Sequence, residues 1–282
     1  AHSQLAEKIS GAGAVLARLT KAMNSCMQDK LRHLGVPDVG GLASLAQKFS
    51  ERRDVDALHN LQGDKIYLYS AEADTTVVGS IVSAARDFYE EVGVPPQNVL
   101  FLRKQSGAHA FITRTDGDAC GTAEPPYINA CDYDQAGAVL KHIHGALVRP
   151  SAKKFIRTDE NFLVFDQRPF FAGMRNHDLA KHGFLFRPQS CVAEPGCAVH
   201  IVFHGCAQSD NAVFTDVALR TGYLRWAQEN RLIVLFPHAK PSKANPKGCW
   251  DWWGVTGDNY LTKQAPQIRA VRAMLAHLAT AG

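Results

Sequence analysis

The sequence has no long hydrophobic run, and neither sign of charge dominates it. No stretch of its 282 residues approaches the ~18 uninterrupted apolar residues that a membrane-spanning helix needs. Its 31 lysines and arginines nearly balance 27 aspartates and glutamates, which leaves a dispersed net charge of +4. Nucleic acid and anionic membranes are therefore poor candidates as partners. The sequence also has no internal repeat and no low-complexity tract, and its 46% of hydrophobic residues are enough for a substantial core.

The seven cysteines include no C-x-x-C pair, so a zinc site is a poor interpretation. Two close pairs bracket loops rich in turn-forming residues, and a third, distant pair could also form a bridge. These candidate bridges are Cys120–Cys131, Cys191–Cys197 and Cys206–Cys249. Disulfides would indicate a secreted or periplasmic protein and would leave Cys26 without a partner. The alternative is a reduced protein with seven buried thiols.

Short apolar runs alternate with amphipathic segments along the chain. Strands are expected at 66–69, 98–102, 184–186, 199–203 and 232–236. Helices are expected over most of 1–62 and at 77–92, 134–147, 214–230 and 267–279. Because the strands are almost wholly apolar and separated by helices, the pattern predicts an α/β fold. In such a fold a mostly parallel sheet carries helices on both faces.

The chain is expected to form a single domain, residues 1–282. Residues 1–149 and 183–282 would be joined by a polar, irregular connection over 150–182. Turns are expected at Gly35-Val36-Pro37 and at Gly40-Gly41. The small residues of Gly11–Ala17 could form a buried strand instead of a helix. The sequence shows no signal peptide, so a secreted chain would be mature or truncated.

Two polar loops follow predicted strands of the first half. Asp74 comes after the strand at 66–69, and His109 comes after the strand at 98–102. Reactive groups of α/β sheets gather in such loops. An acid loop followed by a histidine loop is the second half of the Ser…Asp…His order, in which the carboxylate orients the imidazole. Alternatively, Asp74 is only a cap, with Thr75 or Thr76 capping the next helix, and His109 is a surface histidine.

A third loop, His204-Gly205-Cys206, follows the strand at 199–203. A His-Gly turn in this position can aim a backbone N–H at a developing oxyanion. A nucleophilic or metal-binding pair of His204 and Cys206 lacks a supporting motif. His142 and His144 are two residues apart on a predicted helix, so their side chains point in different directions and no metal site is expected there either.

The run Gly248-Cys249-Trp250-Asp251-Trp252-Trp253-Gly254 holds three of the four tryptophans. A loop-borne aromatic cluster suits a recognition surface for a hydrophobic substrate, and buried core aromatics are the alternative.

A serine nucleophile is missing from this set. No G-x-S-x-G pentapeptide occurs, although a serine hydrolase of this kind needs one between a strand and a helix. The segments around Ser44 and Ser3 lack the spacing or the glycines, and neither follows a strand.

Four segments together resemble one family. They are 66–77 (IYLYSAEADTTV), 107–145, 183–209 (ending HIVFHGCAQS) and 221–254 (ending GCWDWWG). The chain, roughly over residues 60–280, is similar to the fungal-type single-domain poly(3-hydroxybutyrate) depolymerases. These are secreted serine esterases with a circularly permuted α/β-hydrolase fold, and the HGCxQ and GCWDW motifs are quite specific to them.

The resemblance implies a role for each candidate residue. Asp74 would be the triad acid, His109 the base, and the Cys206 N–H an oxyanion donor. Trp250 would lie beside the polymer-binding crevice. The three bridges named above would form, and the protein would act on a polyester as a monomer without metal or organic cofactor. The family's Gly-x-Ser-Ser-Gly-Gly elbow and a partner for Cys26 are expected before Ala1, so residues 1–282 alone are expected to be inactive.

Other functions stay open. The protein could be a non-catalytic member of the fold that binds a hydrophobic polymer or a partner through the tryptophan loop. It could also be a related esterase for smaller esters. A cytosolic redox or metal protein would require free thiols.

Overall fold

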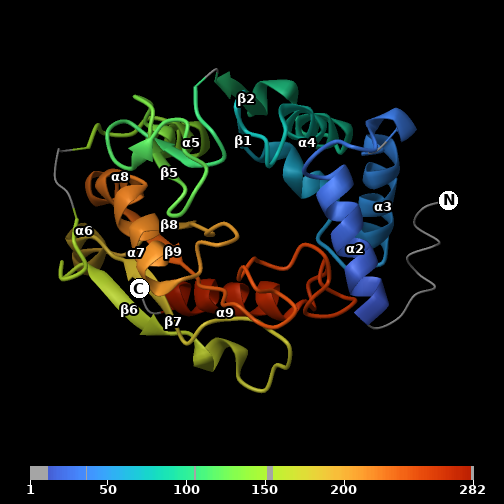
Figure 1. Cartoon of the computed structure of the whole chain (residues 1–282). Coiled ribbons are helices and arrows are strands. Elements are labelled where there is room, and N and C mark those ends of the chain that lie inside the picture. The colour runs from blue at the N-terminus through green and yellow to red at the C-terminus, as the bar shows by residue number, and fades with distance from the viewer. Residues whose placement is uncertain (1–11, 36, 105, 151–154, 281–282) are drawn as a thin grey trace. The chain divides into compact units, whose positions relative to one another are not determined.

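The computed structural model describes residues 12–35, 37–104, 106–150 and 155–280 (Figure 1). Its internal contacts divide the chain into two compact units. The first unit comprises Ala1–His109 and Asp251–Ala265, and the second comprises Ala110–Trp250 and Pro266–Gly282. The expectation of a single domain over residues 1–282 stays a prediction.

The first unit begins with helices, as the composition of residues 1–62 indicates. Helix α2 spans Ala12–Ser25, so the alternative of a strand at this place is wrong for the described residues, and Gly11 lies outside them. Helix α3 spans Val39–Glu51, and the Asp38 carboxylate caps it by accepting from the Gly41 N–H at 2.9 Å. The expected turn at Gly40-Gly41 is therefore wrong, because this cap starts the helix before the glycines.

A two-stranded parallel sheet forms the centre of the first unit. Strand β1 (Ile66–Ala71) pairs with β2 (Val99–Lys104), with Ile66 opposite Val99, and helix α4 (Gly79–Glu91) connects them. The expected strands are confirmed, and their parallel pairing brings both carboxyl ends to the same edge. The short 3₁₀ helices of this unit are η1 (Arg32–Leu34), η2 (Leu58–Gly63) and η3 (Pro96–Asn98).

The second unit contains a mixed four-stranded sheet in the order β6-β7-β9-β8. Strands β8 and β9 are parallel, whereas β6 and β7 are antiparallel to their neighbours. Their bounds are β6 Phe162–Asp166, β7 His182–Phe186, β8 Ala198–Ile201 and β9 Leu232–Phe236. The three strands expected over 184–236 are thus confirmed.

The connection expected at 150–182 contains an unexpected strand. Edge strand β6 lies within it, and its Leu163 and Val164 side chains are 43% and 48% exposed. The run 162–165 is as apolar as the predicted strands, but it lies within a segment whose polar, irregular composition indicates a connection. After β6, the buried Gln167 side chain donates to the carbonyls of Ala180 and His238 and accepts from the His238 N–H. This segment is therefore an integral part of the sheet region.

Apolar side chains of the sheet point to both of its faces. Leu232, Val234 and Phe236 of β9 belong to one buried cluster, while Leu235 belongs to another. The first cluster includes side chains of α5, α7 and α8, and the second includes Ala270 and Met274 of α9. The helices around the sheet, labelled in Figure 1, are α5 (Gln135–His144), α6 (Gln189–Ala193), α7 (Asn211–Arg220), α8 (Tyr223–Glu229) and α9 (Pro266–Thr280). Helices therefore cover both faces, as predicted.

The helix expected over 214–230 is two helices, because Gly222 between α7 and α8 has a φ of 94°. A residue in this left-handed conformation interrupts a right-handed helix, and glycine adopts it without strain. None of the helices in the described part of the chain is long and apolar enough to cross a membrane.

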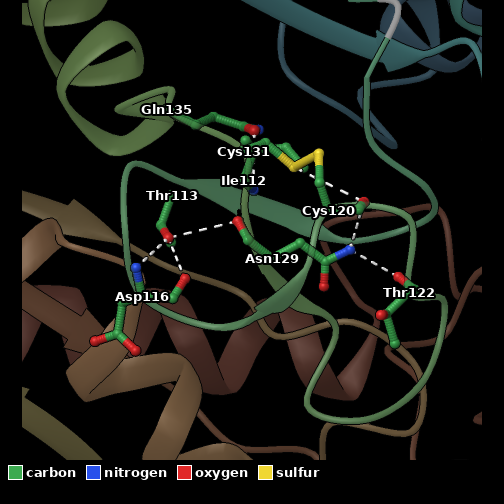
Figure 2. Close-up of a disulfide and its surroundings, with 8 residues drawn as sticks. All are labelled: Ile112, Thr113, Asp116, Cys120, Thr122, Asn129, Cys131 and Gln135. Atoms are coloured by element: carbon green, nitrogen blue, oxygen red, sulfur yellow. Dashed lines mark hydrogen bonds between the residues drawn. A yellow bond between two sulfur atoms is a disulfide. The ribbon is translucent and has the colours of Figure 1, made fainter.

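A small parallel sheet of the second unit follows His109 in the chain. Its order is β3-β5-β4, with bounds Phe111–Thr113, Ile128–Ala130 and Asp118–Ala119. The Cys120–Cys131 disulfide closes its loop, as Figure 2 shows. Inside the loop, the fully buried Asn129 donates from Nδ2 to the carbonyls of Cys120 (3.0 Å) and Thr122 (2.7 Å). One disulfide and one amide thus order a segment with little regular structure of its own.

Candidate active site

Asp74 lies in the loop that follows β1, and both of its carboxylate oxygens are used. Oδ1 accepts from the backbone N–H groups of Thr76 (2.8 Å) and Val77 (2.9 Å). Oδ2 lies 2.9 Å from Nδ1 of His109, and the Asp74 side chain is 13% exposed. Asp74 is thus a turn cap and the partner of a histidine at once. Neither Thr75 nor Thr76 caps α4, because the N-cap residue is Val78 and it makes no side-chain capping bond.

His109 follows β2, so the parallel pairing of β1 and β2 brings the two loops together. Its side chain is 41% exposed, and the residues before it are Gly107 and the buried Ala108. A carboxylate that accepts a hydrogen bond from Nδ1 fixes the neutral imidazole as the Nδ1–H tautomer. The lone pair is then on Nε2, which is the arrangement that a general base requires.

The pKa of the Asp74 carboxyl lies below its ordinary value. Burial acts to raise this pKa, but the hydrogen bond from His109 and the N–H groups of Val77 and Thr76 lower it by more. Asp74 therefore stays ionised while it holds the imidazole. An ionised carboxylate also stabilises the imidazolium that forms when His109 takes up a proton.

The turn after β8, in the second unit, holds three consecutive amides in different situations. The Gly205 N–H donates to Oε1 of Gln208 at 2.6 Å, and the Ala207 N–H donates to the Lys247 carbonyl at 2.7 Å. The Cys206 N–H between them donates to no group in the described part of the chain, and Cys206 is exposed. This amide is available to an acceptor on a ligand.

His204 fixes this turn from inside. Its Nε2 accepts from the Ala239 N–H at 3.1 Å, so Nδ1 carries the proton and donates to the Gly205 carbonyl at 2.8 Å. Burial lowers the pKa of His204 to about 4, and the neighbouring His238 adds to this effect. A neutral imidazole with both nitrogens engaged by the backbone is a structural group, which argues against a nucleophilic or metal-binding role.

Cys206 forms a disulfide with Cys249, so it has no thiol to act as a nucleophile. The buried Asn245 holds the other end of this bridge: its Oδ1 accepts from the Cys249 N–H at 2.9 Å and its Nδ2 donates to the Cys249 carbonyl at 2.7 Å. The structure contains the same three disulfides that the resemblance implies, Cys120–Cys131, Cys191–Cys197 and Cys206–Cys249. Cys26 is a free cysteine.

Trp250 lies next to the turn residues within the second unit. Its ring meets the Phe203 ring edge-on, with centroids 4.9 Å apart, and also contacts His204. Phe203 is 53% exposed, so an apolar surface borders the turn. The Trp250 Nε1–H is buried and has no hydrogen-bond acceptor among the described residues. The expected substrate-binding role of Trp250 stays a prediction.

Asp251, in the first unit, organises the loop that carries the other two tryptophans. Its carboxylate accepts from four backbone N–H groups and one hydroxyl at 2.6–3.1 Å, and the donors are Trp253, Gly254, Val255 and Thr256. Sequence reasoning missed this role, although an aspartate shortly before a loop glycine, here Gly254, is a typical turn-forming signal.

The remaining two tryptophans of this loop differ in exposure. Trp253 is only 3% exposed, and Trp252 is half-buried against it, with ring centroids 5.3 Å apart. For Trp253 the buried-aromatic alternative is therefore correct, and a direct recognition role is wrong.

Other candidates of the sequence lie elsewhere or lack a site. Ser44 lies inside α3 and does not follow a strand, whereas Ser3 lies outside the described residues. His144 lies against His200 of β8, with ring centroids 5.9 Å apart. Within the described ranges, no three His, Cys, Asp or Glu side chains form a group that could hold a metal ion.

Comparison with known proteins connects this fold and these residues. No family model matches the chain. It is 34% identical over 259 residues to a poly(3-hydroxybutyrate) depolymerase of Delftia acidovorans, covering 91% of this chain and 50% of the relative. It is 32% identical over 220 residues to a polyhydroxybutyrate depolymerase of Talaromyces funiculosus, covering 73% of this chain and 63% of the relative. The chain thus spans about half to two thirds of the length of these relatives.

Solved structures agree with these matches. The PHB depolymerase from Penicillium funiculosum superposes with a TM-score of 0.80 at 28% identity, covering 91% of this chain and 81% of that one. A substituted PHB depolymerase complexed with an R3HB trimer gives the same values.

The chain has the fold of an α/β-hydrolase. This class is indicated by strands with helices on both faces, by an Asp-His pair in successive strand-end loops and by the His-Gly-Cys turn. The acid and histidine loops precede the strand with the His-Gly-Cys turn, which is the permuted order. Within this class, the chain is a homologue of the fungal-type poly(3-hydroxybutyrate) depolymerases.

Proposed function

We propose that the protein is a secreted serine esterase that hydrolyses ester bonds of poly(3-hydroxybutyrate) or a related polyhydroxyalkanoate. The observation that carries this proposal is the 2.9 Å contact between Asp74 Oδ2 and His109 Nδ1. It joins an ionised carboxylate to an imidazole in the tautomer that a general base needs. The homology to polyester depolymerases supports the substrate class.

In the proposed reaction, His109 Nε2 takes the proton of a serine hydroxyl as its oxygen attacks the ester carbonyl. The Cys206 N–H donates to the oxyanion, and collapse of the intermediate releases the alcohol end, which receives the proton from His109. Water activated by His109 then hydrolyses the acyl-serine and releases the acid end. We assign the serine to no residue of the printed sequence, because it contains no G-x-S-x-G pentapeptide.

We place the substrate's apolar chain against Trp250 and the exposed Phe203, which border the oxyanion turn. Aromatic rings bury apolar surface without requiring charge, and this suits an uncharged polyester. The three disulfides support secretion, because such bridges persist in oxidising compartments. We further propose that the enzyme acts as a monomer and needs no metal or organic cofactor.

The test is active-site labelling of the native protein with a fluorophosphonate, followed by peptide mapping. We expect stoichiometric labelling of one serine outside residues 1–282, with release of 3-hydroxybutyrate from polymer film by the unlabelled protein and none after labelling. A label on a serine inside the printed sequence would overturn the assignment of the nucleophile.

Two further outcomes would decide between functions. A protein that adsorbs to the film but takes up no label and releases no hydroxyacid is a non-catalytic binding protein. A labelled protein that cleaves only small soluble esters is an esterase of narrower substrate size, which would contradict the polymer assignment.

A further inference from the structure

The second unit has a cavity that the proposed reaction does not use. It has a volume of about 660 Å³ and is lined by residues from four separate segments. Its wall contains four cationic side chains, which are Arg114, Lys141, Arg149 and Arg225. These residues come from the loop after β3, from α5, from the segment after α5 and from α8. Cations from four places in the chain thus converge on one concavity.

Three arginines of this cavity lack an acidic partner in the part of the chain that the structure describes. Arg114, Arg149 and Arg225 form no ion pair with a carboxylate among the described residues. The contrast with Arg220 on the neighbouring helix is clear, because Arg220 contacts Asp116 at 2.9 Å and Asp216 at 3.3 Å. Like charges that gather in a cavity repel one another unless a counter-ion joins them.

The lining of the cavity includes one buried aromatic ring, that of Trp226. The buried Trp226 ring lies 4.8 Å from the Lys141 ammonium, and its Nε1–H donates to Asp134 Oδ2 at 3.0 Å. Gly137 packs against this ring so closely that any side chain on Gly137 would collide with it. Helix α5 and its N-cap residue Asp134 therefore hold the Trp226 ring in place.

Two carboxylates share the wall with the cations. Asp134 is engaged by the Trp226 indole and, through Oδ1, by the Gly137 N–H at 2.9 Å. Asp132 is exposed at the rim. Four cations against two carboxylates leave an excess of positive charge. This charge attracts a ligand with several negative charges strongly and a weakly charged ligand only slightly.

We propose that this cavity binds a small multivalent oxyanion, such as a polyphosphate or a tricarboxylate. The planar guanidinium of arginine donates two parallel hydrogen bonds to a phosphate or carboxylate group. Three arginines can therefore bind three such groups. The cavity volume is sufficient for a ligand of this size. The site is separate in its residues from Asp74, His109 and Cys206, so it goes beyond the proposed esterase activity.

Calorimetric titration of the native protein with sodium tripolyphosphate tests the proposal. We expect saturable one-to-one binding at low salt, with a Kd that rises steeply as NaCl is added. The variants Arg114→Gln and Arg225→Gln should each raise the Kd about tenfold, because each removes charge-assisted hydrogen bonds. Citrate in place of tripolyphosphate distinguishes carboxylate from phosphate preference within the same class.

Matched controls separate the cavity from general surface charge. Arg272 on α9 is exposed and has no acidic partner among the described residues, so Arg272→Gln should leave the Kd unchanged. Asp74→Asn should also bind tripolyphosphate normally. The proposal is overturned by absence of saturable binding, by an equal effect of Arg272→Gln, or by displacement of tripolyphosphate by equimolar 3-hydroxybutyrate, which is a monoanion.

Discussion

The Asp74–His109 pair and the turn around Cys206 are held in place by different means. In the first unit, one hydrogen bond to an ionised carboxylate orients an imidazole whose side chain is 41% exposed. In the second unit, a disulfide, a buried neutral histidine and the Gln208 side chain fix the turn. The first arrangement depends on charge, and the second depends on covalent and neutral contacts.

This difference matches what each group has to do in the proposed reaction. A general base must accept and return a proton, and its partner must stay charged while it does so. An oxyanion donor stabilises the transition state best when it does not reorganise. The two sites should therefore fail differently when they are perturbed.

The largest effect is expected from Asp74→Asn. The amide cannot hold His109 in the Nδ1–H tautomer as a carboxylate does, so kcat should fall about 10⁴-fold with little change in KM. Initial rates on polymer and on a soluble ester measure this. Asp258→Asn is the control, because the Asp258 side chain is 90% exposed and, among the described residues, forms an ion pair with Arg18 alone. A loss of less than tenfold in Asp74→Asn would contradict the triad assignment.

The Cys206→Ala/Cys249→Ala double variant should lose about 4 kcal/mol of unfolding free energy. A disulfide removes entropy from the unfolded chain, and the entropy removed rises with the length of the loop that the bridge closes. The matched control is Cys191→Ala/Cys197→Ala, whose loop separation is 6 instead of 43 residues, and it should lose about 2 kcal/mol. Urea denaturation measures both. Only the first variant should also lose esterase activity, and equal activities would show that the bridge does not position the turn.

Acid should destabilise the turn before it affects Asp74. Between pH 6.5 and about 4, His204 is protonated in the unfolded chain but neutral in the native chain. As the pH falls through this range, His204 alone should therefore lower the free energy of unfolding by up to about 1.4 kcal/mol for each pH unit. His200, whose pKa burial also lowers to about 4, adds to the slope.

His204→Gln should reduce this slope, which denaturation at several pH values measures. The stabilisation that comes from the lowered pKa of Asp74 is lost only as the pH falls below the ordinary range of a carboxyl. Asp74→Asn should accordingly leave the slope above about pH 5 unchanged. An unaltered slope in His204→Gln would show that other groups cause it.

The smallest effect is expected from Gln208→Ala. This change leaves the Gly205 N–H and the Pro126 carbonyl without the side chain that contacts them at 2.6 Å and 2.7 Å. We expect kcat to fall about tenfold, because the contact with the Gly205 N–H is the one that holds the oxyanion turn and losing one such hydrogen bond corresponds to roughly that factor. Gln208→Glu keeps the acceptor for Gly205 and should retain more activity. Equal rates in both variants would contradict a positioning role.

Sequence reasoning located Asp74, His109 and the Cys206 turn because each follows an apolar run that forms a strand. It treated a cap and a triad acid as alternatives for Asp74, whereas one carboxylate oxygen caps the turn and the other contacts His109. The choice could not be made from sequence, because it depends on the distance between two loops. Partners of individual atoms, such as Ala239 for His204, were out of reach for the same reason.

Local signals also misled where a neighbour decides the conformation. The pair Gly40-Gly41 indicates a turn, but the Asp38 cap begins a helix there. Strand β6 was not predicted because its short apolar run, 162–165, lies inside a segment whose polar composition indicates a connection. The break at Gly222 could have been found, since a glycine between two amphipathic segments is a known helix terminator.

The Asp251 carboxylate has a consequence for protein engineering. It binds the backbone amides of the loop, apart from one hydroxyl, so the path of residues 252–256 is set mainly by chain length and little by side-chain identity. We expect that position 255 can therefore be diversified in a library without loss of the loop conformation, whereas Trp252 packs against Trp253. Gly254 must be kept, since its φ is 87°, a conformation that other residues adopt only with strain.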